Sequence, residues 1–571
     1  MTTRIPGNDY GVLEPPAPGA WRPRMAVSVV IPARGGQDRL DLTLAALAAQ
    51  TYPAHLLEVV VVDDGSVPPL RVPGIAPERT RIVRSPQGRR GIAGAMETGA
   101  AVADGEVVHR MDADIVPYRE HVEAHMRWHH LADYLVVLGR LRFTAATGPL
   151  PAPSQVSGAV ADGGAHGLFV EDPEHGHDWI DELVAAHRGL RDAPSPLLHR
   201  VHVGATVSLP AALLKEAGGL DTSLVLGEDT ELGYRLTQTG AVFVPDAEAV
   251  CWHLGTTTAM RRPAEVRRHN EPFIADRVPY RRNLRSDPGR QWLVPYVEVV
   301  VDVANAPFED VRASVDGALA STLSDVSVVL TGPWALLDAR PPGEEGRAPL
   351  DDPLLDLRLV RGQYAGDGRV RLAERVPATS FPAPFRLTCP PGWVPGAESL
   401  AMLVEQADKD DEGLLLVALD ENETGVVTAR LERTSAVARA LRVAAEGESP
   451  DDVIADLYGA TWLDAETWRF RPASRAYPAW ASARNREAVR WRAEAERHGR
   501  EAERAKQQVA ALKTELRALR AQAAKGDRAT ARWKEKAEQR RLEAVALRRE
   551  RDRSLLRRAA RRLRGLAEGG R

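Results

Sequence analysis

The chain has 571 residues, of which 44% are apolar and 27% charged, and its formal net charge is −4. This composition is typical of a globular protein and does not favour nucleic acid as a partner, while the length predicts two or three domains. Two cysteines, Cys251 and Cys389, are too few for a disulfide framework. The absence of a run of 18 apolar residues and of an N-terminal leader pattern argues against a membrane helix, so we expect a cytoplasmic protein.

Residues 1–24 are rich in Pro and Gly without periodicity, which predicts a flexible arm on the surface. The apolar, β-branched run 27–32 predicts a strand, the leucines of 40–47 follow at helical spacing, and 58–62 predicts a second buried strand that ends at Asp63 and Asp64. Strand, helix and strand at this spacing predict a right-handed βαβ unit and a parallel sheet. Ligands of such sheets bind beyond the carboxyl ends of the strands.

A third predicted strand, 106–110, is followed by Asp112 and Asp114. Alternate residues of an extended segment point the same way, so both carboxylates can face one point. Mg²⁺ and Mn²⁺ prefer oxygen ligands and leave coordination positions for substrate phosphates, so this pair predicts a site for a metal and a nucleoside diphosphate. A solvated turn is the alternative interpretation.

Residues 145–200 are rich in Gly, Pro and His and predict a long excursion over the sheet, in which Trp179 is a candidate for binding an acceptor. A solvated loop with one packed Trp is the alternative. A strand at 203–209 and a helix that starts at the acidic pair Glu228 and Asp229 follow.

In this order and spacing, the first 260 residues or so resemble the family 2 glycosyltransferases with a GT-A fold. The resemblance is carried by 27–32, by 62–66, by the Asp112-Ala113-Asp114 triplet and by 227–229 with Arg235 behind it. It implies that Asp64 binds the nucleotide base, that Asp112 contacts the ribose or the water shell of the metal, and that Asp229 is the catalytic base.

The remaining candidate site residues serve the donor, the metal or the acceptor. We expect the donor to be bound by Pro32, Asp63, Asp64, Arg90 and Asp112. We expect Mn²⁺ or Mg²⁺ to be held by Asp114, Asp112 and His253, although a merely packed His253 is an equal alternative. We expect the acceptor to meet Glu228 and Trp179.

The sequence departs from the family pattern at 33–36, where a polar turn with Asn is usual, and at 88–96, which replaces the usual Gly-rich loop followed by Ala-Arg-Asn. Arg89 or Arg90 in the second segment suits a diphosphate, because a guanidinium matches phosphate geometry, and a surface charge is the alternative. These departures leave open which sugar and base are held.

The predicted function is therefore an inverting, metal-dependent transfer of a sugar from a nucleotide-diphosphate sugar to a hydroxyl of a glycan, lipid-linked or other cell-envelope acceptor. Two other classes stay open at this point. A nucleotidyltransferase would need a Gly-rich basic loop after the first strand, which 34–36 offers only faintly, and a non-catalytic oligomeric scaffold would not need the acids of the first 260 residues.

A second strand, helix and strand at 297–332 repeats the pattern of 27–65, and predicts a degenerate GT-A-like domain over 290–475. The sequence alignment puts Leu330 and Thr331 at the places of Asp63 and Asp64. It puts Thr388 and Pro390 at the places of Asp112 and Asp114, and 457–461 at the place of 226–229, so every acid is lost. An unrelated α/β domain is the alternative.

Residues 480–571 predict a long helix whose seam of Val509, Leu512, Leu516 and Leu519 is typical of a coiled coil, and hence of a homo-oligomer. A lone solvated helix is the alternative. The basic amphipathic end, 555–566, predicts peripheral binding to an anionic membrane surface at the inner face of the cell membrane, or to an acidic polymer. The predicted fold is thus an arm over 1–24, a catalytic α/β domain of the GT-A class over 25–285, a second α/β domain and a helical tail.

Overall fold

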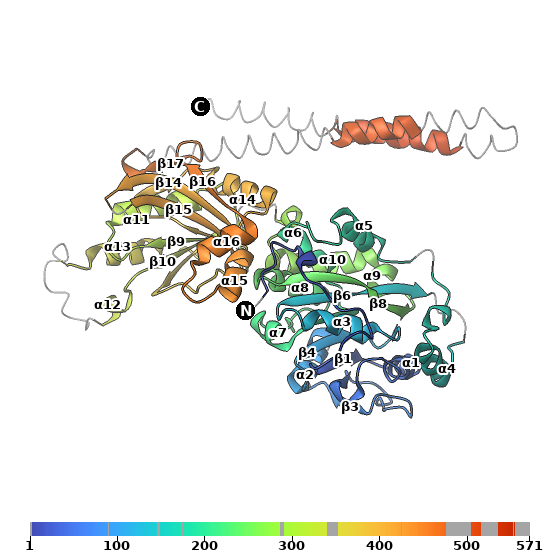
Figure 1. The fold of residues 1–571 in the computed structure, drawn as a ribbon. Coiled ribbons are helices and arrows are strands. Elements are labelled where there is room, and N and C mark those ends of the chain that lie inside the picture. The colour runs from blue at the N-terminus through green and yellow to red at the C-terminus, as the bar shows by residue number, and fades with distance from the viewer. Residues whose placement is uncertain are drawn as a thin grey trace. The chain divides into compact units, whose positions relative to one another are not determined.

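A computed structural model describes residues 3–475 apart from 90, 145–148, 173–174, 286–289, 340–351 and 424, and then residues 504–515, 535–551 and 553. The chain divides into two compact units, Met1–Ala476 and Tyr477–Arg571. The larger unit contains two large mixed sheets with helices packed around them (Figure 1). The predicted α/β class is therefore confirmed for both sheets.

The first sheet has eight strands in the order β3-β2-β1-β4-β7-β6-β8-β5. Their bounds in that order are Arg79–Arg84, Leu57–Asp63, Val27–Ala33, Val107–Met111, Thr206–Pro210, Leu135–Thr144, Val242–Leu254 and Ile115–Pro117. Strands β3, β2, β1 and β4 run parallel, and β7 returns antiparallel to β4. The predicted βαβ unit is confirmed, with Val27 opposite both Leu57 and Val107.

Alternate residues of β1 pack into different cores, because successive side chains of a strand point to opposite faces. Val30 joins the core beneath α2, α7 and α8, whereas Val29 and Ile31 join the core beneath α1 and α3. The helices of this part of the chain are α1 Gln37–Leu47, α2 Ile92–Val102, α3 His121–His129, α4 Pro153–Ala161, α5 Asp178–Ala186, α6 Ser195–Leu198, α7 Ala211–Glu216, α8 Glu228–Gln238, α9 Thr258–Arg261 and α10 Pro263–Arg277. Both faces of the sheet are thus buried, which explains the continuous apolar strands.

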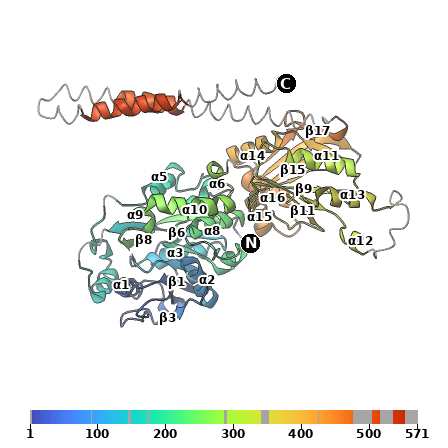
Figure 2. The same ribbon diagram turned by 180° about the vertical axis from the view of Figure 1, so that it is seen from behind.

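The second sheet has seven strands in the order β11-β10-β9-β12-β15-β14-β16. Their bounds in that order are Val370–Ala373, Val326–Thr331, Val297–Asp302, Phe385–Thr388, Gly425–Arg433, Leu414–Asn422 and Ala460–Asp464, and a separate pair joins β13 Trp393–Pro395 to β17 Phe470–Pro472. Its helices are α11 Phe308–Leu319, α12 Ala335–Asp338, α13 Leu355–Tyr364, α14 Ser399–Asp410, α15 Thr434–Val443 and α16 Pro450–Tyr458, some of which are clearer from behind (Figure 2).

The seven strands of the second sheet follow the same order as the strands from β3 to β8 in the first sheet. Each pair of neighbouring strands also has the same parallel or antiparallel direction. The pairing also corrects the sequence alignment. Phe385 lies opposite Val297 and Arg433, as Val107 lies opposite Val27 and Pro210. Counting along the chain from this match places Pro390 and Gly392, rather than Thr388 and Pro390, at the positions of Asp112 and Asp114.

The same match places Gly332 and Pro333 at the positions of Asp63 and Asp64. The alignment was two residues out of register because alternating apolar strands fit their own pattern equally well after a shift of two. The stretch 457–461 is also misaligned, since it contains the end of α16 and the start of β16. The helix that corresponds to α8 is α16, and its first turn does contain acids, Asp451 and Asp452. One of them, Asp451, forms an ion pair with Arg430.

The N-terminal segment is packed between other elements, which corrects the prediction of a flexible surface arm for its described part. Ile5 is fully buried, and Asn8 lies against the backbone of β8. The Asn8 amide donates to the carbonyls of Leu190 and Phe243 and accepts from the Phe243 N–H, at 3.0, 2.9 and 2.8 Å. From α15, the buried Arg439 donates to the carbonyl of Ile5 at 2.9 Å. The N-terminus accordingly lies beside α15 in both views (Figures 1 and 2).

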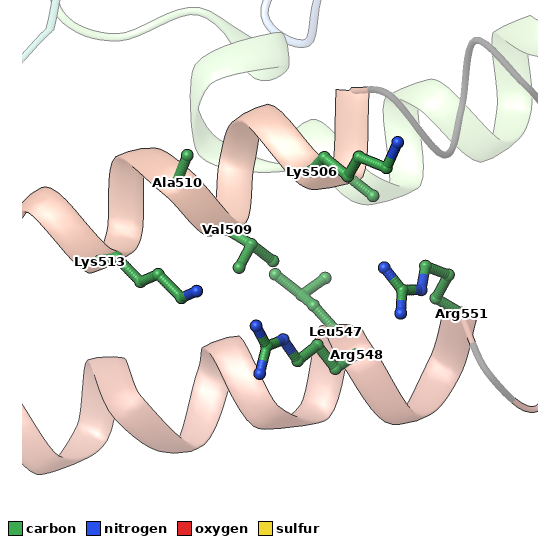
Figure 3. A pocket seen from close by; sticks show the side chains of 8 residues that line it. Lys506, Val509, Ala510, Lys513, Leu547, Arg548 and Arg551 are labelled. Atoms are coloured by element: carbon green, nitrogen blue, oxygen red, sulfur yellow. The ribbon is translucent and has the colours of Figure 1, made fainter.

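The second unit is described over two helical segments, 504–515 and 535–551. Val509 and Leu547 point toward each other across the groove between these segments (Figure 3). Arg540 and Glu515 form an ion pair at 3.7 Å, so the segments run antiparallel. Val509 and Leu512, which were predicted to meet a second chain, therefore lie against a helix of the same chain. Leu516 and Leu519 lie outside the described residues, and the homo-oligomer stays a prediction. The basic end at 555–566 lies outside the described residues.

Within the described part of the chain, no helix combines the length and the apolar character needed to cross a membrane.

Replacing Asn8 tests whether the N-terminal segment contributes to stability. Asn8→Ala removes three hydrogen bonds and leaves buried backbone groups of β8 unpaired, so we expect the free energy of unfolding to fall by about 1–3 kcal/mol. Urea denaturation followed by tryptophan fluorescence measures the change. Asn305→Ala, at an exposed position, is the control and should leave the midpoint unchanged. Equal midpoints for Asn8→Ala and wild type would show that the segment is not part of the cooperative core.

Candidate active site

The end of β4 brings two acids together with a histidine of β8. Asp112, Asp114 and His253 each place one ligand atom within 4.8 Å of the others. Strand β5, which starts directly after the acids, pairs antiparallel with β8 and sets Ile115 opposite His253. The distance from His253 Nε2 to Asp114 Oδ1 is 3.8 Å. These residues lie about 140 positions apart in the sequence and are joined only by strand pairing.

The donor set fits a divalent cation. The Nδ1 of His253 lies 2.9 Å from the carbonyl of Gly255, and a carbonyl can only accept, so this nitrogen carries the hydrogen. In the neutral ring, the Nε2 atom that faces Asp114 then has a lone pair available, which is the usual arrangement of a metal-binding histidine. Arg39 lies on the other side of Asp114, at 3.5 Å, and also donates to the carbonyl of Leu254.

Asp112 is partly buried, and this burial raises the pKa of its carboxyl group. The nearby Arg110 lowers the same pKa, and Asp114 raises it. A cation between Asp112 and Asp114 would remove the repulsion between the two carboxylates.

Asp63 and Asp64, at the end of β2, have different surroundings. Asp63 accepts from the backbone N–H groups of Ser66 and Leu70, at 2.7 and 3.2 Å. Burial raises the pKa of Asp63, but these hydrogen bonds outweigh it and the pKa is lowered overall. Both oxygens of Asp63 thus hold the turn after β2, which argues for a structural role in place of the predicted donor contact.

Asp64 keeps one oxygen available. Its Oδ2 accepts from the N–H of Gly91 at 2.9 Å, whereas its Oδ1 is buried without a hydrogen-bond partner among the described residues. A buried carboxylate oxygen of this kind needs a donor, and a base or ribose group of a nucleotide would supply one. Pro32 lies on β1 opposite Val62, next to this turn. Arg90, the remaining donor-binding candidate, lies outside the described residues.

Asp229 is positioned at the start of α8 by backbone groups. Gly227 precedes the helix in the left-handed region, at φ 81°, which favours glycine. The Oδ2 of Asp229 accepts from the N–H of Gly204 at 3.2 Å, and its Oδ1 accepts from the N–H of Thr230 at 2.7 Å. Its carboxylate is partly exposed and is held in place without a side-chain cation at hydrogen-bond distance among the described residues. This arrangement suits a general base.

Arg110 is a site residue that the sequence reasoning missed. It is buried on β4 and donates to Glu228 Oε1 at 3.1 Å, while Asp112 and Asp229 both raise its pKa. Gly204 makes room for it, because a Cβ there would lie 1.9 Å from Arg110 Cζ. The position two residues before Asp112 was the available signal, since residues i and i+2 of a strand share a face.

Glu228 is only 3% exposed and pairs with Arg110, which leaves too little surface for the predicted contact with an acceptor. Burial and the neighbouring Asp229 raise the pKa of Glu228 to about 7, although Arg110 lowers it. Glu228 therefore supports the buried arginine beneath Asp229.

A cavity of about 380 Å³ lies between α5 and the sheet. The cavity is lined by His177, which directly precedes α5, by Asp181 of α5, and by Gly139 and Thr206. His177 is linked to the metal candidates through Phe143, whose ring lies 4.9 Å from the ring of His177 and 4.9 Å from that of His253. Trp179 is 42% exposed and is not among the residues that line this cavity, and its contact with an acceptor stays a prediction.

Residues 28–169 match the family model described as Glycosyl transferase family 2. This stretch contains β1 to β6 with the acids of β2 and β4, and it excludes Asp229 and His253. The predicted resemblance to the family 2 glycosyltransferases is therefore confirmed for this part of the chain.

The curated relatives are two proteins named validoxylamine A glucosyltransferase, from Streptomyces hygroscopicus subsp. limoneus and from S. hygroscopicus subsp. jinggangensis strain 5008. Each is 31% identical, over 251 and 249 residues, which is 39% and 38% of this chain. The chain spans about half the length of these relatives, 50% and 53%. Among solved structures, a mannosyltransferase from Pyrobaculum calidifontis in complex with GDP-Man and Mn²⁺ is 20% identical. The match covers 50% of this chain and 68% of that one, at a TM-score of 0.31.

The raised pKa of Glu228 predicts a pH-dependent stability in metal-free protein. An acid with a raised pKa in the folded state holds its proton more tightly there than in the unfolded chain. Its contribution to the free energy of unfolding is therefore lost as the pH rises from about 4.5 to about 7. Glu228→Gln should show a shallower fall over this window in chemical denaturation. Glu446→Gln, at an exposed site, is the control, and equal slopes for Glu228→Gln and wild type would contradict the assignment.

Proposed function

We propose that the chain is a metal-dependent, inverting glycosyltransferase that uses a nucleotide-diphosphate sugar. The observation that carries the proposal is the convergence of Asp112, Asp114 and His253 at the end of β4, beside a carboxylate, Asp229, that backbone N–H groups hold in place. The match of residues 28–169 to family 2 glycosyltransferases supports the same class.

In this proposal the residues at the carboxyl ends of the strands bind the donor. Asp64 accepts a hydrogen bond from the nucleotide at its unpaired Oδ1, and Asp112 lies beside the ribose. Asp114 and His253 would hold Mn²⁺ or Mg²⁺, which when bound acts as a Lewis acid that stabilises negative charge on the leaving diphosphate. An oxygen-rich site with one imidazole is acceptable to either cation.

Asp229 takes the proton from the acceptor hydroxyl as that oxygen attacks the anomeric carbon, and the bond to the diphosphate breaks on the opposite face of the sugar. One displacement of this kind inverts the anomeric centre. Arg110 lies next to the residues proposed for this step. Its guanidinium is buried next to Asp112, Glu228 and Asp229, and these three carboxylates raise its pKa and stabilise its charge.

The cavity beneath α5 is the proposed acceptor site. Its volume of about 380 Å³ lies within the range of small-molecule sites, ~300–1,000 Å³. Its mixed lining, with His177 and Asp181 beside Val201 and Val203, suits a ring that carries several hydroxyls. The names of the curated relatives favour a small polar acceptor of this kind over the glycan or lipid-linked acceptor predicted from the sequence. Membrane binding stays a prediction.

Asp229→Asn tests the catalytic base. The amide keeps the size of the side chain but cannot accept the proton, so we expect turnover to fall by ~10²–10⁴-fold. Donor affinity should stay near that of wild type. Release of nucleoside diphosphate in the presence of acceptor measures turnover, and calorimetry measures donor affinity. Asp162→Asn, an exposed position, is the matched control. Turnover of Asp229→Asn near the wild-type rate would refute the assignment.

Asp114→Ala tests the metal site. Removing one carboxylate ligand should abolish the gain in donor affinity that Mn²⁺ gives to the wild type, because the diphosphate is then bound without its bridging cation. Thermal-shift titration of a panel of nucleotide sugars, with and without Mn²⁺, measures this gain and identifies the donor base. An Asp114→Ala protein with the same Mn²⁺-dependent shift as wild type would exclude this site, and Asp162→Ala should retain the shift.

A further inference from the structure

A second group of possible metal ligands lies between the first sheet and α3. His109 of β4 and His121 and His125 of α3 each place one ring nitrogen within 4.8 Å of the other two. All three side chains are fully buried. The two residues of α3 are one turn apart and therefore lie on one face of the helix, which packs against the sheet. None of the three belongs to the site proposed for the donor.

The three rings converge on one point, the hydroxyl of Thr206. The distances from Thr206 Oγ1 to the Nε2 atoms of His121, His109 and His125 are 2.9, 3.0 and 3.4 Å. A hydroxyl has one hydrogen and two lone pairs, so it can form hydrogen bonds with at most three imidazoles. The Nε2 atoms thus surround a single polar centre from three directions.

In two of these rings, the Nδ1 atom lies beside an oxygen that can accept its hydrogen, which favours metal binding by Nε2. His121 Nδ1 lies 3.0 Å from the carbonyl of Val250, so it carries the hydrogen and leaves Nε2 with its lone pair. His125 Nδ1 lies 2.9 Å from Ser208 Oγ, which can accept in the same way. A metal-binding histidine almost always donates its other nitrogen to such an oxygen. Burial also lowers the pKa of all three histidines, so each offers the neutral ring that metals bind.

The second sheet shows that the fold itself does not require these histidines. His109 pairs with Ser208 on β7, and the matching pair on β12 and β15 is Leu387 with Leu431. His121 and His125 are the first and fifth residues of α3, and Ser399 and Leu403 hold the same places in α14. Leu387, Leu403 and Leu431 all belong to the apolar core of that sheet. Hydrocarbon fills this position well, so packing alone does not account for the imidazoles.

The histidine cluster and the cavity beneath α5 share two lining residues. Gly139 and Thr206 form part of the cavity wall. A Cβ at Gly139 would lie 3.0 Å from His125 Nε2 and 2.8 Å from the methyl group of Thr206. A side chain at this position would therefore crowd the histidine cluster, and glycine leaves room beside the ring nitrogen.

We propose that His109, His121 and His125 form a binding site for a Zn²⁺-class cation, distinct from the site at Asp112 and Asp114. Three imidazole nitrogens are a ligand set typical of zinc, whereas Mg²⁺ and Mn²⁺ favour the carboxylates. Thr206, at the centre of the cluster, supplies the nearest oxygen.

The test measures zinc bound to the full-length chain, after treatment with a chelator and equilibrium dialysis against Zn²⁺. An Asp114→Ala background removes zinc held at the acid site. We expect one zinc ion per chain in this background. We expect Co²⁺ in its place to give visible absorption bands of a nitrogen-bound ion.

His109→Leu and His125→Leu copy the residues found at these places in the second sheet, which favours folding of the variants. Loss of an outer partner alone costs ~10–100-fold in metal affinity, so loss of a ligand should weaken zinc binding by more than about 100-fold. His166→Leu, at an exposed position, is the matched control and should bind zinc as before. Circular dichroism checks that each variant is folded.

Thr206→Val separates metal binding from a purely hydrogen-bonded cluster and keeps the proposal testable if the leucine variants fail to fold. This variant keeps the three imidazoles and removes the hydroxyl, so zinc should still bind. Absence of bound zinc in the Asp114→Ala background would overturn the proposal, and so would equal zinc binding by His125→Leu and His166→Leu. The histidines would then serve only as hydrogen-bonding partners of Thr206 and Ser208.

Discussion

The parallel pairing of β4 with β1 is the constraint on which the candidate site depends. It sets the end of β4 beside the end of β1, and the return of β7 antiparallel to β4 brings Ala205 to the backbone N–H of Asp112 at 3.0 Å. Strand β5 then pairs with β8, which carries His253. Backbone hydrogen bonds, and not contacts among the acids, therefore determine where the repelling carboxylates lie. A site for a cation can be built in this way before the cation is present.

A buried arginine accompanies this arrangement. Arg110 occupies the space that Gly204 leaves and lies between Asp112, Glu228 and Asp229. Burying a charge is costly unless it is paired, and Arg110 forms an ion pair with Glu228. This ion pair links the first turn of α8 to β4. The catalytic candidate Asp229 is the next residue along the helix, and the backbone N–H groups of Gly204 and Thr230 hold its carboxylate. Stability and the proposed chemistry thus share one buried ion pair.

The two sheets of the larger unit have the same strand order, but their equivalent positions are filled differently. Where the first sheet has Asp112 and Asp114, the second has Pro390 and Gly392. At the places of His109, His121 and His125, the second has Leu387, Ser399 and Leu403. The second sheet has the same strand order without these polar residues, so the fold does not need them. Arg439 of α15, a helix packed with the second sheet, is hydrogen-bonded to the N-terminal segment.

The sequence by itself determined the local elements and the class of the chain. Apolar periodicity located β1, α1, β2 and β4, and the order of the acidic motifs indicated a family 2 glycosyltransferase, because both depend on neighbouring residues. The exact match between the sheets, the packing of residues 3–24, and the partners of Asp63 and Glu228 depend on which distant strands and helices meet. A strand pattern with period two looks the same after a shift of two residues, and a Pro- and Gly-rich segment gives no sign of the groove that it fills. The roles of Arg110 and of the histidine cluster could be recognised only in the tertiary structure, because they depend on the burial of polar groups. Burial is a property of the folded chain.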